Sequence, residues 1–370
     1  MTIIKNNKNE AKKFVFELIL TTRCNLCCDY CYAKYLKKQD ISFSLVQKLI
    51  DNYPISKLIF TGGEPLLVFP LMREIVSYIK KSKKDINFRL QTNGTLLTDN
   101  VISFIKEFDI EVDISLDGSK VSHDSHRLFQ GDNSGSYGTV LDNFKRLKKN
   151  KVKFTVNYTV NPDTLEGLAE NLALLVKEYT IDVGFVFTEK PILPDIADRY
   201  LKELSKFLFY YHKNHLFLEI DKIYPFETWF RSLLFGETDR LREALDVRCR
   251  YHRMRLFPTG EIYPCVASYS LIPQKYKERC CLGNVENLDT RRLFFLQKEL
   301  DLSEWLADKK LKKCNRVCYL YAKDPANRFK FEKRVAKEII TLLSHFINNL
   351  SLKERQKYAF EIRKKLSLSR

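Results

Sequence analysis

The sequence contains little that would place it in a membrane, a fibre or a disordered state. No run approaches the ~20 consecutive apolar residues that span a bilayer. Residues 14–20 are largely apolar, but Glu17 interrupts them and no small-residue cleavage site follows. Glycine and proline number only 12 and 11 in 370 residues, while 45% of the chain is apolar, which excludes a fibrous or disordered chain. We therefore expect a folded cytoplasmic protein with one large domain and a smaller one, or two ordinary domains.

Acidic residues are too few to balance the basic ones. The chain has 63 lysines and arginines against 46 aspartates and glutamates, a formal charge of +17. This excess makes nucleic acid, acidic peptides and anionic membrane surfaces candidate partners. Lysine runs at residues 80–84 and 148–151 equally fit a surface that lysine keeps soluble.

Cysteine is absent from a long central stretch. Of the ten cysteines, four lie within residues 24–31, none lies between 31 and 249, and six lie within residues 249–318. Because no secretory signal is present, these cysteines indicate metal binding rather than disulfides. The distribution predicts two separate metal regions.

Strand and helix patterns alternate in the first half of the chain. Expected strands cover residues 15–20, 57–60, 86–90, 111–116, 152–160 and 181–187. Helical patterns separate them, one of them with Thr98 as its N-cap. Six such βα units imply parallel strands but are too few for a closed eight-stranded barrel. We expect an α/β fold, a partial (β/α)6 TIM-like barrel, over residues 1–190.

Three further segments are expected after the barrel. Residues 191–247 have a helical pattern, and residues 248–325 are rich in cysteine, with a β-hairpin around Pro258-Thr259-Gly260. The terminal helices of residues 326–370 carry an apolar stripe of Val335, Ile339, Leu343, Phe346 and Leu350. Such a stripe is more often packed on its own core than on a membrane surface or a partner.

The first cysteine group lies on the loop that follows the first expected strand. Its spacing is Cys24-x3-Cys28-x2-Cys31, at the edge of a parallel sheet where sites are built. Thiolates are the usual ligands of iron–sulfur clusters, and three ligands leave one iron open. Cys27 permits a second interpretation, a zinc site of two adjacent Cys-x2-Cys pairs, but such pairs are normally separated by a dozen or more residues. We therefore expect Cys27 to be a bystander.

With Tyr32 after Cys31, this spacing resembles the signature of the radical S-adenosylmethionine (SAM) superfamily. The next three expected strands are each followed by a motif that resembles one of this superfamily. In chain order these motifs are Gly62-Gly63-Glu64-Pro65, Thr92-Asn93-Gly94 and Ser115-Leu116-Asp117-Gly118. Arg127 follows the last of them. Singly, each motif is also typical of an ordinary turn or surface residue. Their joint placement at the carboxyl ends of successive strands makes the resemblance specific.

The resemblance implies a 4Fe-4S cluster on Cys24, Cys28 and Cys31 that binds SAM. It also implies that the remaining motif residues contact SAM: the backbone of Gly62–Pro65 its amino group, Ser115 its ribose and Arg127 its carboxylate. The other cofactor-binding candidates are Tyr32, Thr92, Asn93 and Asp117.

The second cysteine group resembles SPASM and Twitch domains, which carry auxiliary clusters in radical SAM enzymes. Cys249 and Cys265, with Gly260 five positions before Cys265, are similar to the entry motif, and Cys314-x3-Cys318 is similar to the closing pair. The cysteines missing relative to a full SPASM domain imply one auxiliary 4Fe-4S cluster on these four residues. The adjacent pair at 280–281 is then expected to consist of ordinary thiols.

As a function, the resemblance implies reductive cleavage of SAM to a 5′-deoxyadenosyl radical that modifies a peptide or protein. An electron donor such as flavodoxin or ferredoxin is then expected. A fused leader-recognition domain does not fit the dozen or so residues before the first strand, so a separate protein would recognise the leader of a small precursor. Sulfatase maturases carry Asp where this chain has Val266, which disfavours formylglycine formation. The alternatives are a radical SAM enzyme acting on RNA or a nucleotide-type small molecule, and an iron–sulfur electron carrier or scaffold.

Overall fold

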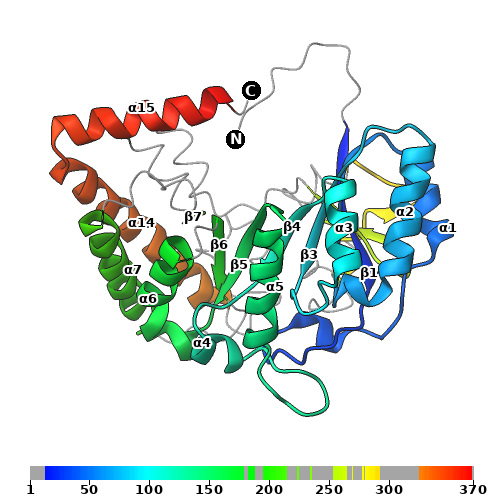
Figure 1. The fold of residues 1–370 in the computed structure, drawn as a ribbon, viewed down its shortest axis with the longest axis horizontal. Helices are drawn as coiled ribbons and strands as arrows, with labels where there is room; N and C mark the ends of the chain where they lie inside the picture. Colours follow the sequence, from blue (N-terminus) through cyan, green and yellow to red (C-terminus); the bar gives the residue numbers. More distant parts are fainter. Residues whose placement is uncertain are drawn as a thin grey trace.

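The computed structural model describes residues 13–178, 182–187, 195–214, 223–224, 234–235, 253–264, 269, 277–278, 280–291 and 325–368. Among them a single ten-stranded sheet organises the chain, in the order β10-β9-β8-β1-β2-β3-β4-β5-β6-β7 (Figure 1). The four ligands expected for the auxiliary cluster, Cys249, Cys265, Cys314 and Cys318, lie outside the described residues.

Seven parallel strands form the main part of the sheet. They are β1 (Phe14–Thr21), β2 (Ile55–Gly62), β3 (Asn87–Thr92), β4 (Glu111–Ser115), β5 (Phe154–Val160), β6 (Asp182–Phe187) and β7 (Ile223–Tyr224). The six expected strands are confirmed, and so is the α/β partial barrel. β7 is an addition within a region predicted to be helical, because a strand of two residues is too short to show a period of two.

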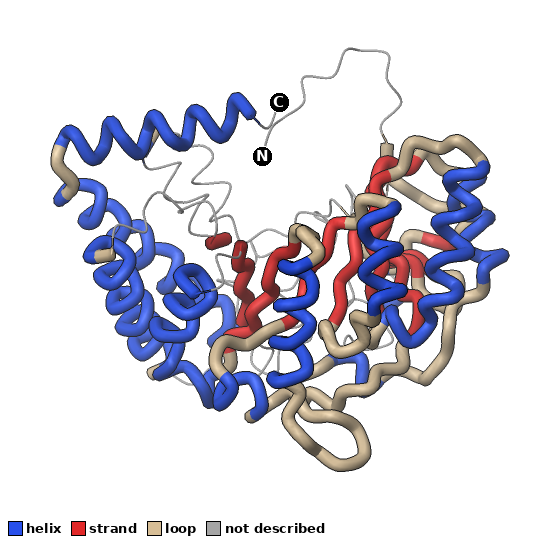
Figure 2. The backbone as a smooth tube through the Cα atoms, viewed as in Figure 1, coloured by secondary structure: helices blue, strands red, loops and turns tan. Residues whose placement is uncertain are grey.

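Helices follow the strands and lie along one side of the sheet (Figure 2). They are α1 (Phe43–Asn52), α2 (Phe69–Lys81), α3 (Asp99–Glu107), α4 (Lys120–Asp124), α5 (Tyr137–Lys149), α6 (Leu168–Ala173) and α7 (Ile196–Lys213), with short turns η1 (Tyr32–Tyr35), η2 (Pro65–Val68), η3 (Pro162–Gly167) and η4 (Leu174–Glu178). The Thr98 side chain accepts a hydrogen bond from the Val101 amide at the start of α3, which confirms the predicted N-cap.

The two faces of the sheet differ in chemistry. Alternate residues of β1, Phe16, Leu18 and Leu20, are fully buried in the hydrophobic core. Because side chains alternate across a strand, Glu17 lies on the other face, where it is also buried. There the carboxylate pairs with Arg255, at 2.6 Å from Nε, and with Arg253, at 3.4 Å from Nη1. The face that carries Glu17 therefore holds a buried ion-pair network beside the apolar Ile19.

The predicted hairpin is confirmed, but its place in the molecule was not foreseen. Strands β8 (Met254–Leu256) and β9 (Glu261–Tyr263) flank the turn, where Gly260 has φ +90°. β8 pairs in parallel with β1, and β10 (Gly283–Asn284) pairs with β9. The cysteine-rich region thus extends the barrel sheet past its first strand.

The C-terminal helices are α14 (Pro325–Asn349) and α15 (Leu352–Leu368). Val335, Ile339, Leu343 and Leu350 are buried in the core, and Arg334 of α14 pairs with Asp198 of α7. This confirms that the apolar stripe packs on the protein's own core. Among the described residues, no helix combines the length and apolar character needed to cross a membrane.

Candidate active site

The loop that carries Cys24, Cys28 and Cys31 leaves β1 at the carboxyl edge of the sheet. A segment after β4, residues 126–130, holds it by backbone pairing. The Cys27 amide donates to the Leu128 carbonyl at 2.8 Å, and the Gln130 amide donates to the Asn25 carbonyl at 2.9 Å. An antiparallel bridge joins Leu26 and Phe129 between these bonds. We call residues 24–31 the Cys loop; its shape depends on a segment about 100 residues further along the chain.

The structure brings the three predicted cluster thiols together. Burial raises the pKa of Cys28 to about 12, Arg127 lowers it, and the nearby Cys31 and Cys24 raise it further. Burial also raises the pKa of Cys24. A metal that displaces these protons would relieve the cost of burying thiolates.

Two of these sulfur atoms already accept N–H donors. The amides of Leu26 and Ala33 donate to Cys24 and Cys31 at 3.4 Å each, and Asn93 Nδ2 lies 3.7 Å from the Cys24 sulfur. Hydrogen bonds to sulfur are among the features that tune iron–sulfur clusters. The residues present therefore fit a cluster held by Cys24, Cys28 and Cys31.

Cys27 lies apart from this group in its contacts. Its side chain is exposed, and its sulfur lies 3.5 Å from the Leu128 carbonyl oxygen and 3.7 Å from Asn133 Oδ1. This placement agrees with its expected role as a bystander.

Gly62 and Gly63 allow the end of β2 to approach the Cys loop closely. A Cβ atom at Gly62 would lie 2.2 Å from the Thr21 carbonyl oxygen, and one at Gly63 would lie 2.1 Å from that of Arg23. The Gly63 and Glu64 amides donate to these same two oxygens at 2.8 Å. Only glycine fits such contacts without displacing the backbone.

Glu64 connects the ends of β2 and β3. Its carboxylate is fully buried and accepts hydrogen bonds from the Leu66 amide, the Thr92 hydroxyl and the Asn93 amide, at 2.8–3.0 Å. Burial raises its pKa to about 7 despite these bonds. Asn93 in turn reaches Cys24 and, at 2.9 Å, Asn25. Glu64 therefore positions Asn93 against the Cys loop, while Pro65 is buried at the start of η2.

Asp117 and Arg127 form a buried ion pair behind the Cys loop. Arg127 donates to Asp117 through Nε at 2.7 Å and through Nη2 at 3.2 Å. The Tyr30 hydroxyl also donates to this carboxylate, at 2.5 Å, and its ring lies 5.5 Å from the Arg127 guanidinium. The sequence motifs indicated Asp117 and Arg127 separately; their pairing, and the part of Tyr30, were not foreseen.

The remaining predicted SAM contacts occupy the same edge. Ser115 is the last residue of β4 and is partly buried, and Thr92 ends β3. Tyr32 begins η1 directly after Cys31. The roles of these residues toward SAM stay predictions.

His123 was not given a role, yet it is fully buried here. Its Nδ1 accepts a hydrogen bond from the Asp117 amide at 3.2 Å, and its Nε2 lies 2.9 Å from the Ser136 hydroxyl. Burial lowers its pKa to about 4, and the Arg127 charge lowers it in the same direction. A neutral His123 thus fixes the turn that carries Asp117.

Cys280 and Cys281 precede β10, away from the Cys loop in sequence. Cys280 is fully buried, and the Cys281 sulfur lies 3.5 Å from the Gly283 carbonyl oxygen. Their expected character as ordinary thiols stays a prediction.

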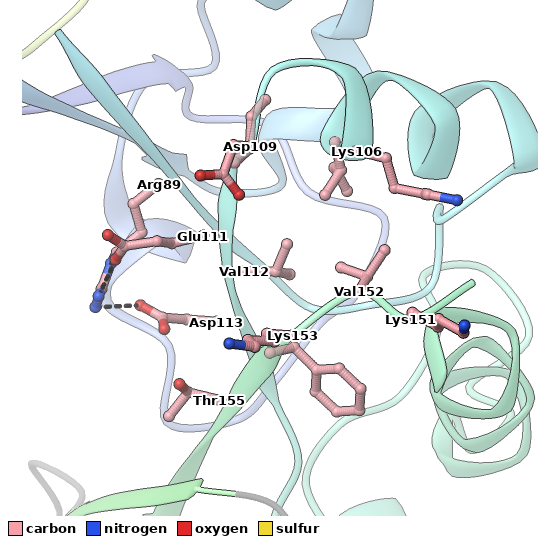
Figure 3. A pocket seen from close by; sticks show the side chains of 13 residues that line it. Arg89, Lys106, Asp109, Glu111, Val112, Asp113, Lys151, Val152, Lys153 and Thr155 are labelled. Atoms are coloured by element: carbon pink, nitrogen blue, oxygen red, sulfur yellow. Dashed lines mark hydrogen bonds and ion pairs between the residues drawn. The ribbon is translucent and has the colours of Figure 1, made fainter. Parts of the chain in front are cut away.

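A pocket of about 460 Å³ lies at the opposite edge of the sheet, where β4 and β5 begin (Figure 3). Arg89, Glu111 and Asp113 line it, and Arg89 forms an ion pair with each of the two carboxylates. Lys106, Lys151 and Lys153 also line it. The pocket is therefore charged, and it is separate from the edge that carries the Cys loop.

The geometry around the Cys loop agrees with a family match. Residues 18–175 match the model of the Radical SAM superfamily. The chain carries a radical SAM domain. This confirms the resemblance drawn from the motifs, and with it the expected use of a 4Fe-4S cluster and SAM by this domain.

Two curated relatives each match less than half of this chain. An uncharacterized protein of Methanocaldococcus jannaschii is 36% identical over 43% of this chain and 57% of its own length. A cysteine-type anaerobic sulfatase-maturating enzyme of Clostridium novyi is 32% identical over 39% of this chain and 42% of its own. The chain thus spans about half the length of these relatives.

Solved structures show the same fold over more of the chain. Native anSMEcpe with bound AdoMet and Kp18Cys peptide has a TM-score of 0.68 and 21% identity, covering 92% of this chain and all of that one. Streptococcus suis SuiB bound to precursor peptide SuiA has a TM-score of 0.50 and 16% identity, covering 76% and 64%. At these identities the likeness concerns the fold alone.

Proposed function

We propose that this protein is a radical SAM enzyme that modifies a peptide or protein. The observation that carries the proposal is the meeting of three thiols, from Cys24, Cys28 and Cys31, on one loop at the carboxyl edge of the barrel. The Glu64–Asn93 connection and the Asp117–Arg127 pair hold that loop from two sides. An electron carrier would have no use for the SAM-type motifs at four strand ends.

When bound, the cluster and SAM supply the chemistry, the reductive cleavage of SAM to a 5′-deoxyadenosyl radical. The chain's own residues bind and orient the cofactors and the substrate, and they shield the reaction from side reactions. Asn93 orients its amide toward the Cys24 sulfur, and Glu64 fixes Asn93. Arg127 holds a positive charge in a buried setting beside Cys28, where a carboxylate of SAM would be bound strongly.

A peptide or protein substrate is supported by the relatives. Sulfatase-maturating enzymes are among them, and solved structures of similar fold contain peptides. The resemblance to sulfatase maturases implies an Asp where this chain has Val266, so we propose a crosslink, thioether, epimer or oxidised residue rather than formylglycine. A small precursor, a separate leader-recognition protein and a flavodoxin or ferredoxin donor complete the proposal, with one auxiliary 4Fe-4S cluster on Cys249, Cys265, Cys314 and Cys318.

The charge of +17 favours one second candidate, a radical SAM enzyme acting on RNA. RNA binding through phosphates would weaken steeply with added salt. Binding of a peptide precursor through apolar and backbone contacts would not weaken steeply with added salt.

The test is SAM cleavage by anaerobically reconstituted protein supplied with dithionite. We expect 5′-deoxyadenosine and methionine from the wild type and from Cys27→Ala, and neither above background from Cys28→Ala. Short peptides encoded beside the gene, deuterated at candidate positions, should transfer deuterium into 5′-deoxyadenosine. Equal cleavage by Cys28→Ala would refute the cluster assignment, and deuterium transfer from RNA instead of peptide would refute the substrate class.

A further inference from the structure

A second group of side chains of metal-ligating type lies at the Cys loop and has no part in the function proposed above. Asp29, His126 and Asp163 each offer one ligand atom, and these atoms lie within 4.8 Å of one another. Asp29 belongs to the Cys loop, His126 to the segment that pairs with it, and Asp163 to η3 after β5. Three elements distant in sequence therefore converge on one point of the carboxyl edge.

His126 is the member of this group that indicates a ligand. Its side chain is 5% exposed, and neither ring nitrogen makes a hydrogen bond within the described part of the chain. Nδ1 nevertheless lies 3.2 Å from Asp29 Oδ1, so the ring is directed into the group. The Tyr30 ring, 5.9 Å away between centroids, packs beside it. Because buried polar atoms are nearly always satisfied, this imidazole calls for a ligand in addition to its ion-pair contact with Asp29.

The loop that carries Asp163 has a second unsatisfied group. Asn161 is 1% exposed, and its Nδ2 has no hydrogen-bond partner among the described residues. An amide N–H is not a metal ligand, but it can donate to a water or an anion bound to a metal. Buried nitrogen atoms without a hydrogen bond, Asn161 Nδ2 and the two of the His126 ring, thus lie on two of the three converging segments.

We propose that Asp29, His126 and Asp163 bind one divalent transition-metal ion. The set of one imidazole and two carboxylates suits Zn²⁺, Mn²⁺ or Fe²⁺, and it differs from the thiolates of the Cys loop. The separation of 3.2 Å between Nδ1 and Oδ1 is what two ligands show when each lies about 2.0–2.2 Å from the same ion. Two carboxylates also balance the charge of the ion when the imidazole is neutral.

Three protein ligands leave at least one position open, as in catalytic metal sites. The burial pattern fits this, because His126 is buried while Asp29 and Asp163 are exposed. A water or a substrate oxygen could complete the coordination from the solvent side. The ion would also tie the Cys loop to η3.

The experiment measures Mn²⁺ binding to the cluster-reconstituted full chain after passage over a chelating resin. Mn²⁺ is the probe because it favours oxygen and imidazole ligands over thiolates. We expect one Mn²⁺ per chain by loss of the free-ion EPR signal, with nitrogen modulation from one imidazole in the pulsed spectrum. Asp163→Asn, a change at an exposed residue, should weaken binding at least 10-fold. His126→Gln should abolish the nitrogen modulation.

Matched controls are Asp142→Asn, which removes an exposed charge on α5, and His345→Gln, which removes an exposed histidine on α14. Both should bind Mn²⁺ as the wild type does. Absence of a stoichiometric site, or unchanged affinity and modulation in both test variants, would overturn the proposal and leave an ion-pair cluster only. The readout does not depend on SAM cleavage, so an inactive protein with an intact site would count against the proposed function alone.

Discussion

Arg127 shows how one residue can serve both the fold and a ligand. Its guanidinium is buried against Asp117, so removing it leaves an uncompensated carboxylate. We expect Arg127→Ala to raise the Kd for SAM by roughly 10- to 150-fold, because a charge-assisted hydrogen bond contributes about 1.5–3 kcal/mol. Equilibrium binding at unchanged iron content measures this.

A double variant separates the two roles. Arg127→Ala/Asp117→Asn removes the unpaired buried charge and should regain thermal stability relative to Arg127→Ala. If it also regains wild-type SAM affinity, Arg127 acts through folding and its predicted contact with the SAM carboxylate is wrong.

His123 makes stability depend on pH. Its pKa of about 4 lies below the usual 6.5, so the unfolded chain binds more protons than the folded one between these values. The contribution of neutral His123 to the free energy of unfolding is therefore fully present above pH 6.5 and is lost as the pH falls towards 4. The free energy of unfolding changes by about 3 kcal/mol over this range. We expect the melting temperature of the wild type to fall over this range, and that of His123→Asn to fall less. His345→Gln is the control and should follow the wild type.

The sequence predicted a residue's place in the site well where the residue belongs to a motif. It predicted that place poorly where only the fold brings the residue to the site. The spacing of Cys24, Cys28 and Cys31 indicated the thiols that the structure brings together. It could not show that Tyr30 donates to Asp117, because those residues lie 87 positions apart. His126 directly precedes Arg127, but no motif gave it or Asp163 a role, and only the converging loops distinguish them.

At the scale of elements, the pairing of the Cys loop with residues 126–130 is the feature most open to test. Proline at position 27 would remove the amide that donates to the Leu128 carbonyl at 2.8 Å. We expect Cys27→Pro to lower bound iron after reconstitution substantially, because the loop loses its register. Cys27→Ala keeps the amide and should bind iron as the wild type does. Equal iron in both variants would show that the Cys loop holds its shape without this pairing.

Local periodicity predicted strands more successfully than it predicted their neighbours. The strict alternation of residues 152–160 gave β5, and the Pro258-Thr259-Gly260 turn gave the hairpin. Neither pattern could predict that β8 pairs with β1, because the local sequence of a strand does not identify its neighbour in the sheet. The sequence therefore could not show that β8, β9 and β10 join the same sheet as β1.

At the scale of the whole molecule, the number of clusters is the main prediction. The triple variant Cys24→Ala/Cys28→Ala/Cys31→Ala should keep about half of the wild-type iron, because Cys249, Cys265, Cys314 and Cys318 are expected to hold one further 4Fe-4S cluster. Iron analysis and the visible spectrum measure this. Changes at Cys280 or Cys281 should leave the residual iron unaltered. An iron-free triple variant would exclude the auxiliary cluster. A triple variant that keeps two 4Fe-4S clusters would indicate that Cys280 or Cys281 is a ligand.

The contact between β8 and β1 also bears on synthesis of the chain. Arg255 and Glu17 meet across 238 positions of sequence. Since a ribosome delivers the amino terminus first, β1 emerges long before the strand that covers its outer edge exists. During that interval its backbone donors and acceptors are open to pairing with other chains, which is the usual route to aggregation of nascent sheets. We therefore expect the pairing of β8 with β1 to be among the last events of folding, since non-local pairing of this kind forms slowly.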